Sequence, residues 1–288
     1  MGIDYYARLW NSEIDILKVV NTLCYDNGRR FVQQDRLHAI EDLLEDTPYR
    51  QRNKEGLFLL YMKKRHFSDL PKKVLLVSSH IDCKNKGQEH ITKCFTEDSD
   101  PMKLRGTFDN SITNAALLVL MRKGLLPDNV LISFTGDEEE DSAGAYQTNR
   151  YLIKHERKYF ALVLDVTSEG WQDAADFTIE NMAVKKPLEK KIIKAAMRSD
   201  YIWRFVPKRE GAYPDYLEDD VRLPGFSWPD ESWDYAECDV DTMSFCLPVN
   251  TEGDFDMHSD MGVEAYKMSF HNYIEALRQM IVCLAKSI

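Results

Sequence analysis

The sequence predicts an α/β protein, a three-layer α/β/α sandwich with a mixed, mainly parallel central sheet. Apolar runs such as 73–79 (KVLLVSS) and 129–135 (NVLISFT) are nearly continuous, which is typical of strands buried on both faces. Segments with helical apolar spacing alternate with these runs, as they do in α/β folds. Polar residues suited to metal binding follow several of the runs, where sheets of this kind open a crevice at their strand ends.

Each element is assigned from its apolar period and its length. Helical spacing is found at 12–25, 35–44, 110–123, 142–155, 188–198 and 262–286. Strands are expected at 56–62, 73–79, 129–135, 160–166, 177–180 and 202–206. Asp109 or Asn110 is a plausible N-cap of the third helix, because short polar side chains satisfy free N–H groups at helix starts. We expect one catalytic domain that spans residues 1–288.

The segment 209–237 interrupts the alternation. It is rich in acidic and aromatic residues and has no clear period, so we expect it to be irregular. It is either a solvated surface insertion or a loop that forms a pocket, since long irregular loops in compact domains are often functional. Its position between the fourth and fifth motifs described below favours the pocket.

Composition restricts the function classes. The net charge of -11 repels phosphate backbones and anionic lipid heads, so neither nucleic acid nor a membrane is an expected partner. No apolar run approaches the roughly 18 residues of a membrane span, and the N-terminus lacks a signal-peptide pattern. The six cysteines form no Cys-x-x-Cys pair, which favours free thiols in a reducing cytoplasm.

Five short stretches carry residues that bind divalent metal ions. A hydrolytic pair of ions needs a bridging carboxylate, further ligands on each ion and an open position for water. The order of the stretches along the chain is more informative than any one of them. They are 79–82 (SHID), 106–110 (GTFDN), 137–139 (DEE), 164–165 (LD) and 257–259 (MHS).

Each stretch also has a purely structural alternative. Asp109 could be no more than a helix cap, and the acids at 137–141 could be a solvated run before a helix N-terminus, where acids are favoured. Asp165 ends a very apolar strand, which is an expensive place for an unpaired charge. Positions two apart on a strand share a face, so Asp82 could accept the free imidazole N–H of His80. His258 taken alone is no evidence for a metal site. The occurrence of all five stretches in one chain is what favours a metal site.

Taken together, the five stretches resemble the zinc-dependent exopeptidases, a family that includes double-zinc aminopeptidases, aminoacylase and carboxypeptidase-G-like enzymes, and tetrahedral aminopeptidases. The matching region covers roughly 74–266. The resemblance implies two divalent ions, with Zn²⁺ the expected metal. It implies that His80, Asp109 and Asp165 bind one ion, that Asp109 bridges, and that Glu139 and His258 bind the other. Glu138 would be the general base, and the Asp109–Asn110 peptide bond would be cis.

The lengths of chain between the five stretches narrow the choice among the subtypes of this family. The stretch between His80 and Asp109 is too short for the small domain that tetrahedral aminopeptidases insert there. The stretch from Asp165 to His258 must supply core strands and a helix, which leaves no room for the dimerising lid of the aminoacylase type. The single-domain, double-zinc aminopeptidase type therefore fits best. Two departures, Thr113 and Glu140-Asp141 at usual glycine positions, concern the substrate pocket.

The expected activity is metal-dependent hydrolysis of an amide bond, most simply removal of N-terminal residues from small peptides. Glu138 would take a proton from water and return it to the leaving amine. Acids in 209–237, together with Asp239, could receive the free amino group of a substrate. A deacylase or carboxypeptidase acting on an acylated amino acid or peptide is the alternative, in which case Arg150 or Arg209 should bind the substrate carboxylate.

Two further interpretations remain open. The chain could be a catalytically inactive binding protein, or a structural domain whose acidic runs are only solvated surface. The sequence leaves the oligomeric state open, an oligomer included. The fifth assignment is wrong if His271 or His90 replaces His258 in the structure.

Overall fold

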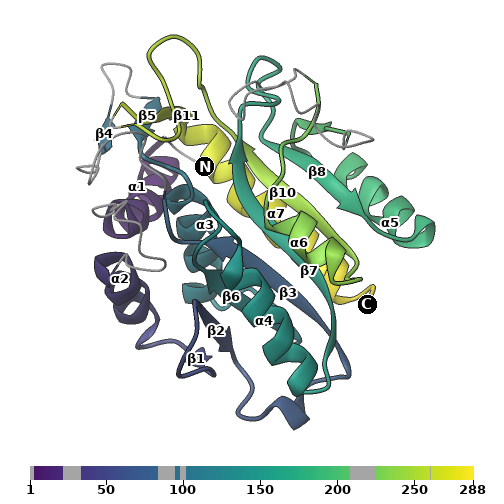
Figure 1. Cartoon of the computed structure of the whole chain (residues 1–288). Coiled ribbons are helices and arrows are strands. Elements are labelled where there is room, and N and C mark those ends of the chain that lie inside the picture. Colours follow the sequence, from purple (N-terminus) through teal and green to yellow (C-terminus); the bar gives the residue numbers. More distant parts are fainter. Residues whose placement is uncertain (1–2, 22–33, 84–94, 98–101, 208–224, 260) are drawn as a thin grey trace.

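The central sheet organises the molecule (Figure 1). In the computed structural model, which describes residues 3–21, 34–83, 95–97, 102–207, 225–259 and 261–288, it has eight strands in the order β1-β2-β6-β3-β7-β10-β8-β9. Their bounds are β1 Arg50–Gln51, β2 Phe58–Met62, β3 Lys73–His80, β6 Val130–Thr135, β7 Lys158–Thr167, β8 Phe177–Ala183, β9 Trp203–Phe205 and β10 Thr242–Pro248.

Four adjacent strands in the middle of this sheet, β6, β3, β7 and β10, run parallel. Strand β2 joins β6 antiparallel on one side, and β8 joins β10 antiparallel on the other. The sheet is therefore mixed and mainly parallel, as predicted. Because parallel strands end at the same edge, the segments that follow β3, β6 and β7 lie close together.

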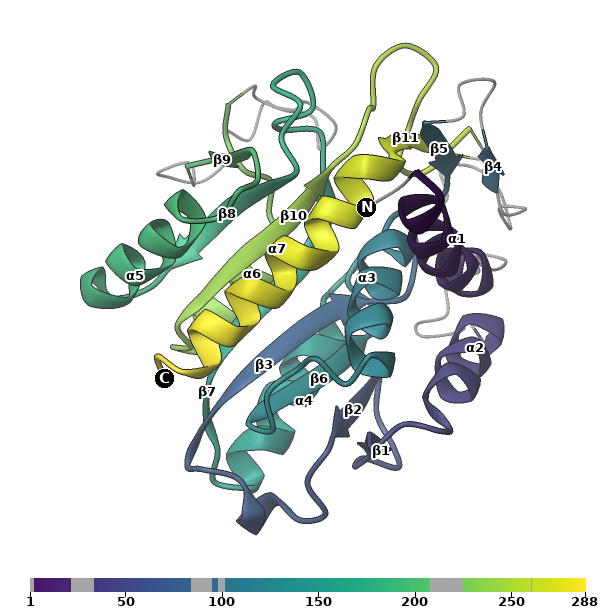
Figure 2. The same cartoon turned by 180° about the vertical axis from the view of Figure 1, so that it is seen from behind.

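Helices cover both faces of the sheet. Helices α1 (Ile3–Val20), α2 (Gln34–Leu44), α3 (Ser111–Arg122), α5 (Lys186–Met197) and α7 (Lys267–Ala285) lie on one face (Figure 2). Helices α4 (Ala143–Lys154) and α6 (Glu231–Glu237) lie side by side on the other face. The larger hydrophobic core fills the first interface, and α3 is buried along almost its whole length. The predicted three-layer architecture is confirmed.

A small second sheet lies beside the ends of the parallel strands. Its order is β11-β5-β4, with bounds β4 Phe95–Glu97, β5 Lys103–Gly106 and β11 Val263–Tyr266. Strands β5 and β11 pair antiparallel, with Gly106 opposite Val263. The chain leaves β5 directly into the segment that carries Asp109, and it enters β11 from the segment that carries His258. This pairing therefore brings two distant parts of the sequence together.

Three of the expected elements differ from the structure, and one central strand was not expected. The last helix begins at Lys267 rather than Gly262, because 263–266 form β11. The first helix ends at Val20, and its expected end at Tyr25 lies outside the described residues. The segment 209–237 is not irregular throughout, since Glu231–Glu237 form α6, while 208–224 lie outside the description. Strand β10 was not expected, although it is buried in the middle of the sheet.

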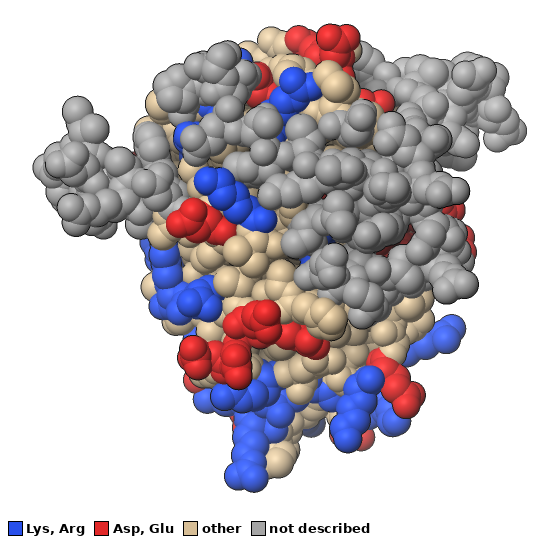
Figure 3. Space-filling view, turned by 90° about the vertical axis from the view of Figure 1, so that its left-hand side faces the viewer, with Lys and Arg blue, Asp and Glu red and all other residues tan. Residues whose placement is uncertain are grey.

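Charge is unevenly distributed between the two ends of the parallel strands. Exposed cations precede the strands, with Lys72 and Lys73 at the start of β3 and Lys158 at the start of β7. In Figure 3, Lys and Arg side chains gather towards the lower end of the molecule. The predicted metal-binding acids lie at the opposite, C-terminal end of these strands. Within the described part of the chain, no helix is long and apolar enough to cross a membrane.

Candidate metal centre

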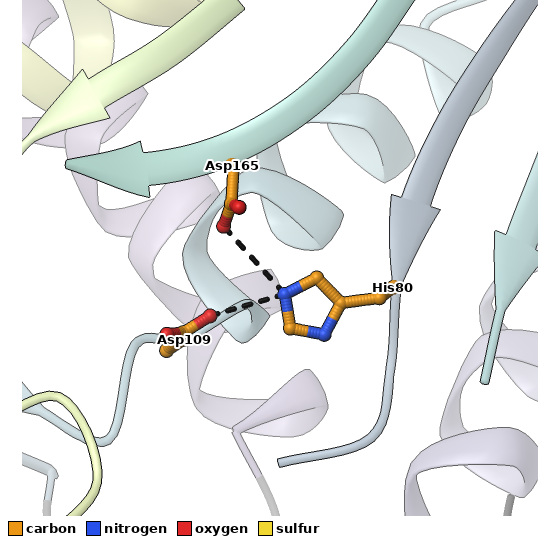
Figure 4. A group of neighbouring side chains, drawn as sticks. All are labelled: His80, Asp109 and Asp165. Atoms are coloured by element: carbon orange, nitrogen blue, oxygen red, sulfur yellow. Dashed lines mark ion pairs between the residues drawn. The ribbon is translucent and has the colours of Figure 1, made fainter. Parts of the chain in front are cut away.

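His80 and Asp165 are placed by neighbouring parallel strands. Ser79 of β3 is paired with Leu164 of β7, so the next residue on each strand, His80 and Asp165, lie side by side at the strand ends. The Nε2 atom of His80 is 3.5 Å from Asp165 Oδ1 and 3.1 Å from Asp109 Oδ1 (Figure 4). The three side chains come from different elements and point at one another. They form one candidate group for a metal ion.

Asp109 also faces the second histidine. Its other oxygen, Oδ2, lies 3.7 Å from His258 Nε2, which is 3.4 Å from Glu139 Oε2. Asp109, Glu139 and His258 form a second candidate group. Because the two oxygens of Asp109 face two different histidines, this carboxylate has the position of a bridge between two ions.

Asp109 is positioned by its neighbours in the segment before α3. The Asp109–Asn110 peptide bond is cis, as the resemblance implies. Asn110 occupies the N-cap position of α3, but its side chain makes no capping hydrogen bond there. Its Nδ2 donates instead to the Leu164 carbonyl oxygen (2.7 Å) on β7. The expectation that Asp109 could be only a helix cap is therefore wrong.

Residues on α3 and just after α1 add further hydrogen bonds around His80 and Asp109. Asn114 Nδ2 on α3 donates to the His80 carbonyl oxygen (2.7 Å), which ties α3 to the end of β3. Asn21, just after α1, accepts hydrogen bonds at Oδ1 from the hydroxyls of Ser111 and Thr107. All of these polar groups are buried. A buried network with satisfied partners restricts the positions that Asp109 and His80 can take.

The acids that follow β6 occupy different environments. Asp137 has a positive φ of 69° and accepts at Oδ2 from the Ala143 N–H at the start of α4. Glu138 Oε2 lies 3.9 Å from His80 Nε2. The main-chain N–H of Glu139 donates to Asp82 Oδ2 (3.2 Å). Glu140, in contrast, is exposed. Only the middle of the acidic run therefore faces the metal-binding groups.

Asp82 lies on the far side of His80 from the other carboxylates. Its Oδ1 is 3.5 Å from His80 Nδ1, whereas Asp109 and Asp165 face Nε2. This is the arrangement expected for a carboxylate that orients an imidazole ligand. Asp82 is 8% exposed and is not among the residues that line the pocket described below.

His258 is held by its own loop. Asp256 Oδ1 accepts a hydrogen bond from the His258 main-chain N–H (2.7 Å). Of the alternative histidines, His271 pairs instead with Glu13 (3.0 Å) on α1, and His90 lies outside the described residues. The structure therefore brings His258, and not His271, to the predicted ligands.

Burial and crowding make this group of side chains unfavourable without cations. Burial raises the pKa of Glu138 well above its ordinary value, that of Glu139 to about 7 and that of Asp165 to about 6. Burial lowers the pKa of His258, but the Asp109 and Glu139 carboxylates outweigh it and raise that pKa to about 9.

The donor atoms fit divalent ions. His80 Nε2 and Asp109 Oδ1 are buried and have no hydrogen-bond partner among the described residues, which is costly unless a cation binds them. Imidazole nitrogens and carboxylate oxygens are the donor set that Zn²⁺ takes in hydrolytic sites. A third candidate group, His80 with Glu138 and Glu139, shows that Glu138 is also within reach of an ion.

A pocket of about 480 Å³ opens onto these groups. Its lining residues include Asp109, Glu138, Glu139, Asp165 and His258. Trp228, Pro229, Phe255 and Met257 provide apolar surface, and Glu180 and Asp230 are further acidic lining residues. The part of 209–237 that the structure describes therefore contributes to a pocket, as one of the two interpretations proposed.

Sequence reasoning missed Glu180 and did not single out Asp230 or Trp228. Glu180 was seen only as the end of a strand, and nothing local distinguishes it. Asp230 follows Pro229 and precedes a short helix, which is a cap signal rather than a pocket signal. Asp239, which was expected to face a substrate, is exposed and is not a lining residue.

Several solved structures are similar to this chain over most of its length. A TET aminopeptidase from the marine sediment archaeon Thaumarchaeota archaeon is similar over 94% of this chain and 96% of its own, with a TM-score of 0.68 and 12% identity. The LapA aminopeptidase of Legionella pneumophila is similar over 96% and 72%, with a TM-score of 0.66 and 10% identity. A tripeptidase from Staphylococcus aureus is similar over 96% and 99%, with a TM-score of 0.58 and 10% identity.

This chain has the fold of these peptidases. The resemblance that the five stretches indicate is thus confirmed for the fold. A TET aminopeptidase is among the similar structures, so the fold does not separate the subtypes that the spacing distinguishes. No protein-family model and no curated protein matches the sequence.

Proposed function

We propose that this chain is a metal-dependent hydrolase of amide bonds, and specifically an aminopeptidase that acts on small peptides. The observation that carries the proposal is the placement of Asp109 between His80 and His258, with Glu138 beside the same groups. Two ions, with Zn²⁺ the expected metal, would be held by His80, Asp109 and Asp165 and by Asp109, Glu139 and His258. Such ions polarise a carbonyl oxygen and lower the pKa of water.

The protein side chains have separate tasks in this proposal. Glu138 lines the pocket and holds a raised pKa because of its burial, so it suits a group that accepts a proton from water and returns it to the leaving amine. Asp82 orients His80 through Nδ1. The loop of Trp228 and Pro229 provides apolar surface for a substrate side chain.

The charge of the pocket favours an aminopeptidase over a deacylase or carboxypeptidase. Those enzymes must bind a substrate carboxylate, which requires a cation. Among the described lining residues there is no Lys or Arg. Arg150 is exposed on α4 and does not line the pocket, and Arg209 lies outside the described residues.

The same residues support the proposal of a single catalytic domain. The proposed ligands range from His80 at the end of β3 to His258 before β11, and helices from both ends of the chain pack on α3. Residues 1–288 would then form one catalytic unit.

A panel of matched substrates tests the function. Free-amino dipeptides, their N-acetylated forms and C-terminally amidated forms are assayed with and without added Zn²⁺, Co²⁺ or Mn²⁺. We expect hydrolysis of the free-amino peptides, whether or not the C-terminus is amidated, and its loss in chelator. Preference for the acetylated forms would favour a deacylase. Absence of hydrolysis with every metal would contradict the enzyme proposal.

A further inference from the structure

Two acidic side chains line the pocket without being candidate metal ligands. Glu180 lies on β8 and Asp230 immediately precedes α6, and they are 3% and 8% exposed. Neither makes an ion pair with any described residue, and the lining residues that the structure describes include no Lys or Arg. Buried carboxylates are normally paired with a cation, so these two need explanation.

Asp230 lines the pocket, and hydrogen bonds within the described part of the chain hold only one of its two carboxylate oxygens. Its Oδ1 is the N-cap of α6 and accepts from the Ser232 main-chain N–H (2.9 Å) and from the Ser232 hydroxyl. Its Oδ2 has no hydrogen-bond partner among the residues that the structure describes. A carboxylate that is fixed at one oxygen and left open at the other has one acceptor available for a ligand.

Glu180 reinforces the negative potential at this place. The Thr178 hydroxyl donates to Glu180 Oε1 (2.6 Å), which fixes the side chain. Burial, assisted by the charge of Asp230, raises the pKa of Glu180 to about 7. A bound cation would favour the ionised form of both carboxylates.

The loop before α6 is built to hold Asp230 in place. Asn181, which follows Glu180 on β8, accepts at Oδ1 from Ser227 Oγ (2.6 Å) and from Trp233 Nε1 (2.9 Å). Its Nδ2 donates to the Trp228 carbonyl oxygen (2.8 Å). The residue after Glu180 thus holds the loop on both sides of Asp230, so the two acids are positioned by one structural unit.

We propose that Asp230 and Glu180 receive a positively charged nitrogen of the substrate. This inference rests on the proposed function, because it places that nitrogen in the pocket that opens onto the metal centre. Two groups of a peptide carry this chemistry: the α-ammonium group of any N-terminal residue, and the side chain of an N-terminal Lys or Arg. Oriented acceptors that bind one of them would fix which residue is removed.

Binding of two amines tests the inference without any hydrolysis. Leucinol carries an α-ammonium group beside a leucine side chain, and n-butylamine resembles a lysine side chain. Their affinities for the Zn²⁺-loaded protein are measured by calorimetry, together with that of the des-amino analogue of leucinol. We expect Asp230→Asn and Glu180→Gln each to weaken binding of one amine by roughly 10- to 100-fold, as for a lost hydrogen bond to a charged group.

The variants are chosen to preserve the structure. Asn keeps the capping oxygen of Asp230, and Gln keeps the acceptor that Thr178 uses, so thermal melting should stay near the wild-type value. If one variant fails to fold, the other still tests the proposal. Asp239→Asn is the matched control, because Asp239 has a positive φ that Asn tolerates and it does not line the pocket.

Each outcome has a definite meaning. Loss of leucinol affinity assigns the α-ammonium group, and loss confined to n-butylamine assigns the side chain. Unchanged affinity for both amines in both variants would overturn the proposal, since the amines would then bind through the metal ions alone. A wild-type protein that binds leucinol through Asp230 but cleaves no peptide would contradict the proposed function and keep the amine subsite.

Discussion

Gly262 approaches Gly106 so closely that a Cβ atom on Gly262 would lie 2.3 Å from the Gly106 carbonyl oxygen. This contact fastens the end of the His258 loop to the start of the Asp109 segment. We expect Gly262→Ala to lower the melting temperature and to weaken metal binding, because the added methyl group must separate the two segments. The measurement is calorimetric titration with Zn²⁺ alongside thermal melting.

Gly253→Ala is a close control for that change. Gly253 also has a positive φ, 71° against 63° for Gly262, but a Cβ atom there would meet nothing within 4 Å. Both substitutions place an alanine in the left-handed region, which costs roughly 1 kcal/mol of backbone strain. Only Gly262→Ala should also reduce metal affinity, and equal effects of the two variants on metal binding would contradict the role of the contact.

Glu138 and Glu139 are neighbours with different proposed tasks. Glu138→Gln keeps size and hydrogen bonding but removes the base, so it should retain close to two metal equivalents and lose amide hydrolysis by about 10² to 10⁴-fold. Glu139→Gln should instead weaken metal binding. Metal content by mass spectrometry and peptide hydrolysis rates separate the two effects. Loss of metal in Glu138→Gln would indicate that the group of His80, Glu138 and Glu139 is a ligand set.

Asn181 should influence substrate binding without touching the metal centre. Asn181→Ala removes the three hydrogen bonds that hold Ser227, Trp228 and Trp233. We expect KM to rise by about tenfold or more, since several bonds worth about 1 kcal/mol each are lost, while metal content stays unchanged. Asp239→Ala is the control, because Asp239 also has a positive φ, 59° against 49° for Asn181, and does not line the pocket. A change in metal content rather than KM would show that the loop supports the ligands instead.

The buried carboxyl of Glu231 should make the stability of the protein depend on pH. This carboxyl is 1% exposed, and Ser78 Oγ donates to its Oε2 (2.9 Å). Burial raises its pKa from 4.5 to about 7, so between these values the folded protein holds more protons than the unfolded chain. Stability of the chelated protein should therefore fall as the pH rises through this window.

Glu231→Gln should remove the part of that dependence that this carboxyl contributes, and leave the parts due to Glu139 and Asp165. The variant is expected to match the wild type near pH 4.5 and to be more stable at pH 8, by on the order of 1 to 3 kcal/mol. Urea unfolding at the two pH values provides the measurement. Glu237→Gln on the same helix is the control, because Glu237 is exposed and should change little. A destabilised Glu231→Gln at pH 8 would show that the charged form is required.

The sequence identifies the metal centre better than the pocket, because the metal-binding residues lie in local motifs and the pocket depends on the order of strands in the sheet. His80, Asp109, Asp165 and the acids after β6 each follow a recognisable strand or precede a helix, so the edge at which they meet can be inferred. Glu180 gives no such signal, because its role depends on β10 lying between β7 and β8. That arrangement is a long-range feature that no local period records.

The errors in element bounds have local causes. Residues 263–266 continue the apolar spacing of α7, so a strand there could not be distinguished from a longer helix. Helix α6 lacks a period because Glu231, Ser232 and Tyr235 are all buried, the first two among polar groups. Apolar periodicity detects a helix with one buried apolar face, and a short helix that buries polar side chains gives no such pattern.

The position of β10 has a consequence for chain synthesis. Strands β7 and β8 follow each other in sequence, yet β10, made much later, pairs with both of them. Until residues 242–248 have been added, the growing chain would carry two unpaired strand edges, one on β7 and one on β8. Unpaired edges can pair with strands of other chains. A nonsense mutation before Thr242 should therefore yield aggregates rather than a soluble fragment.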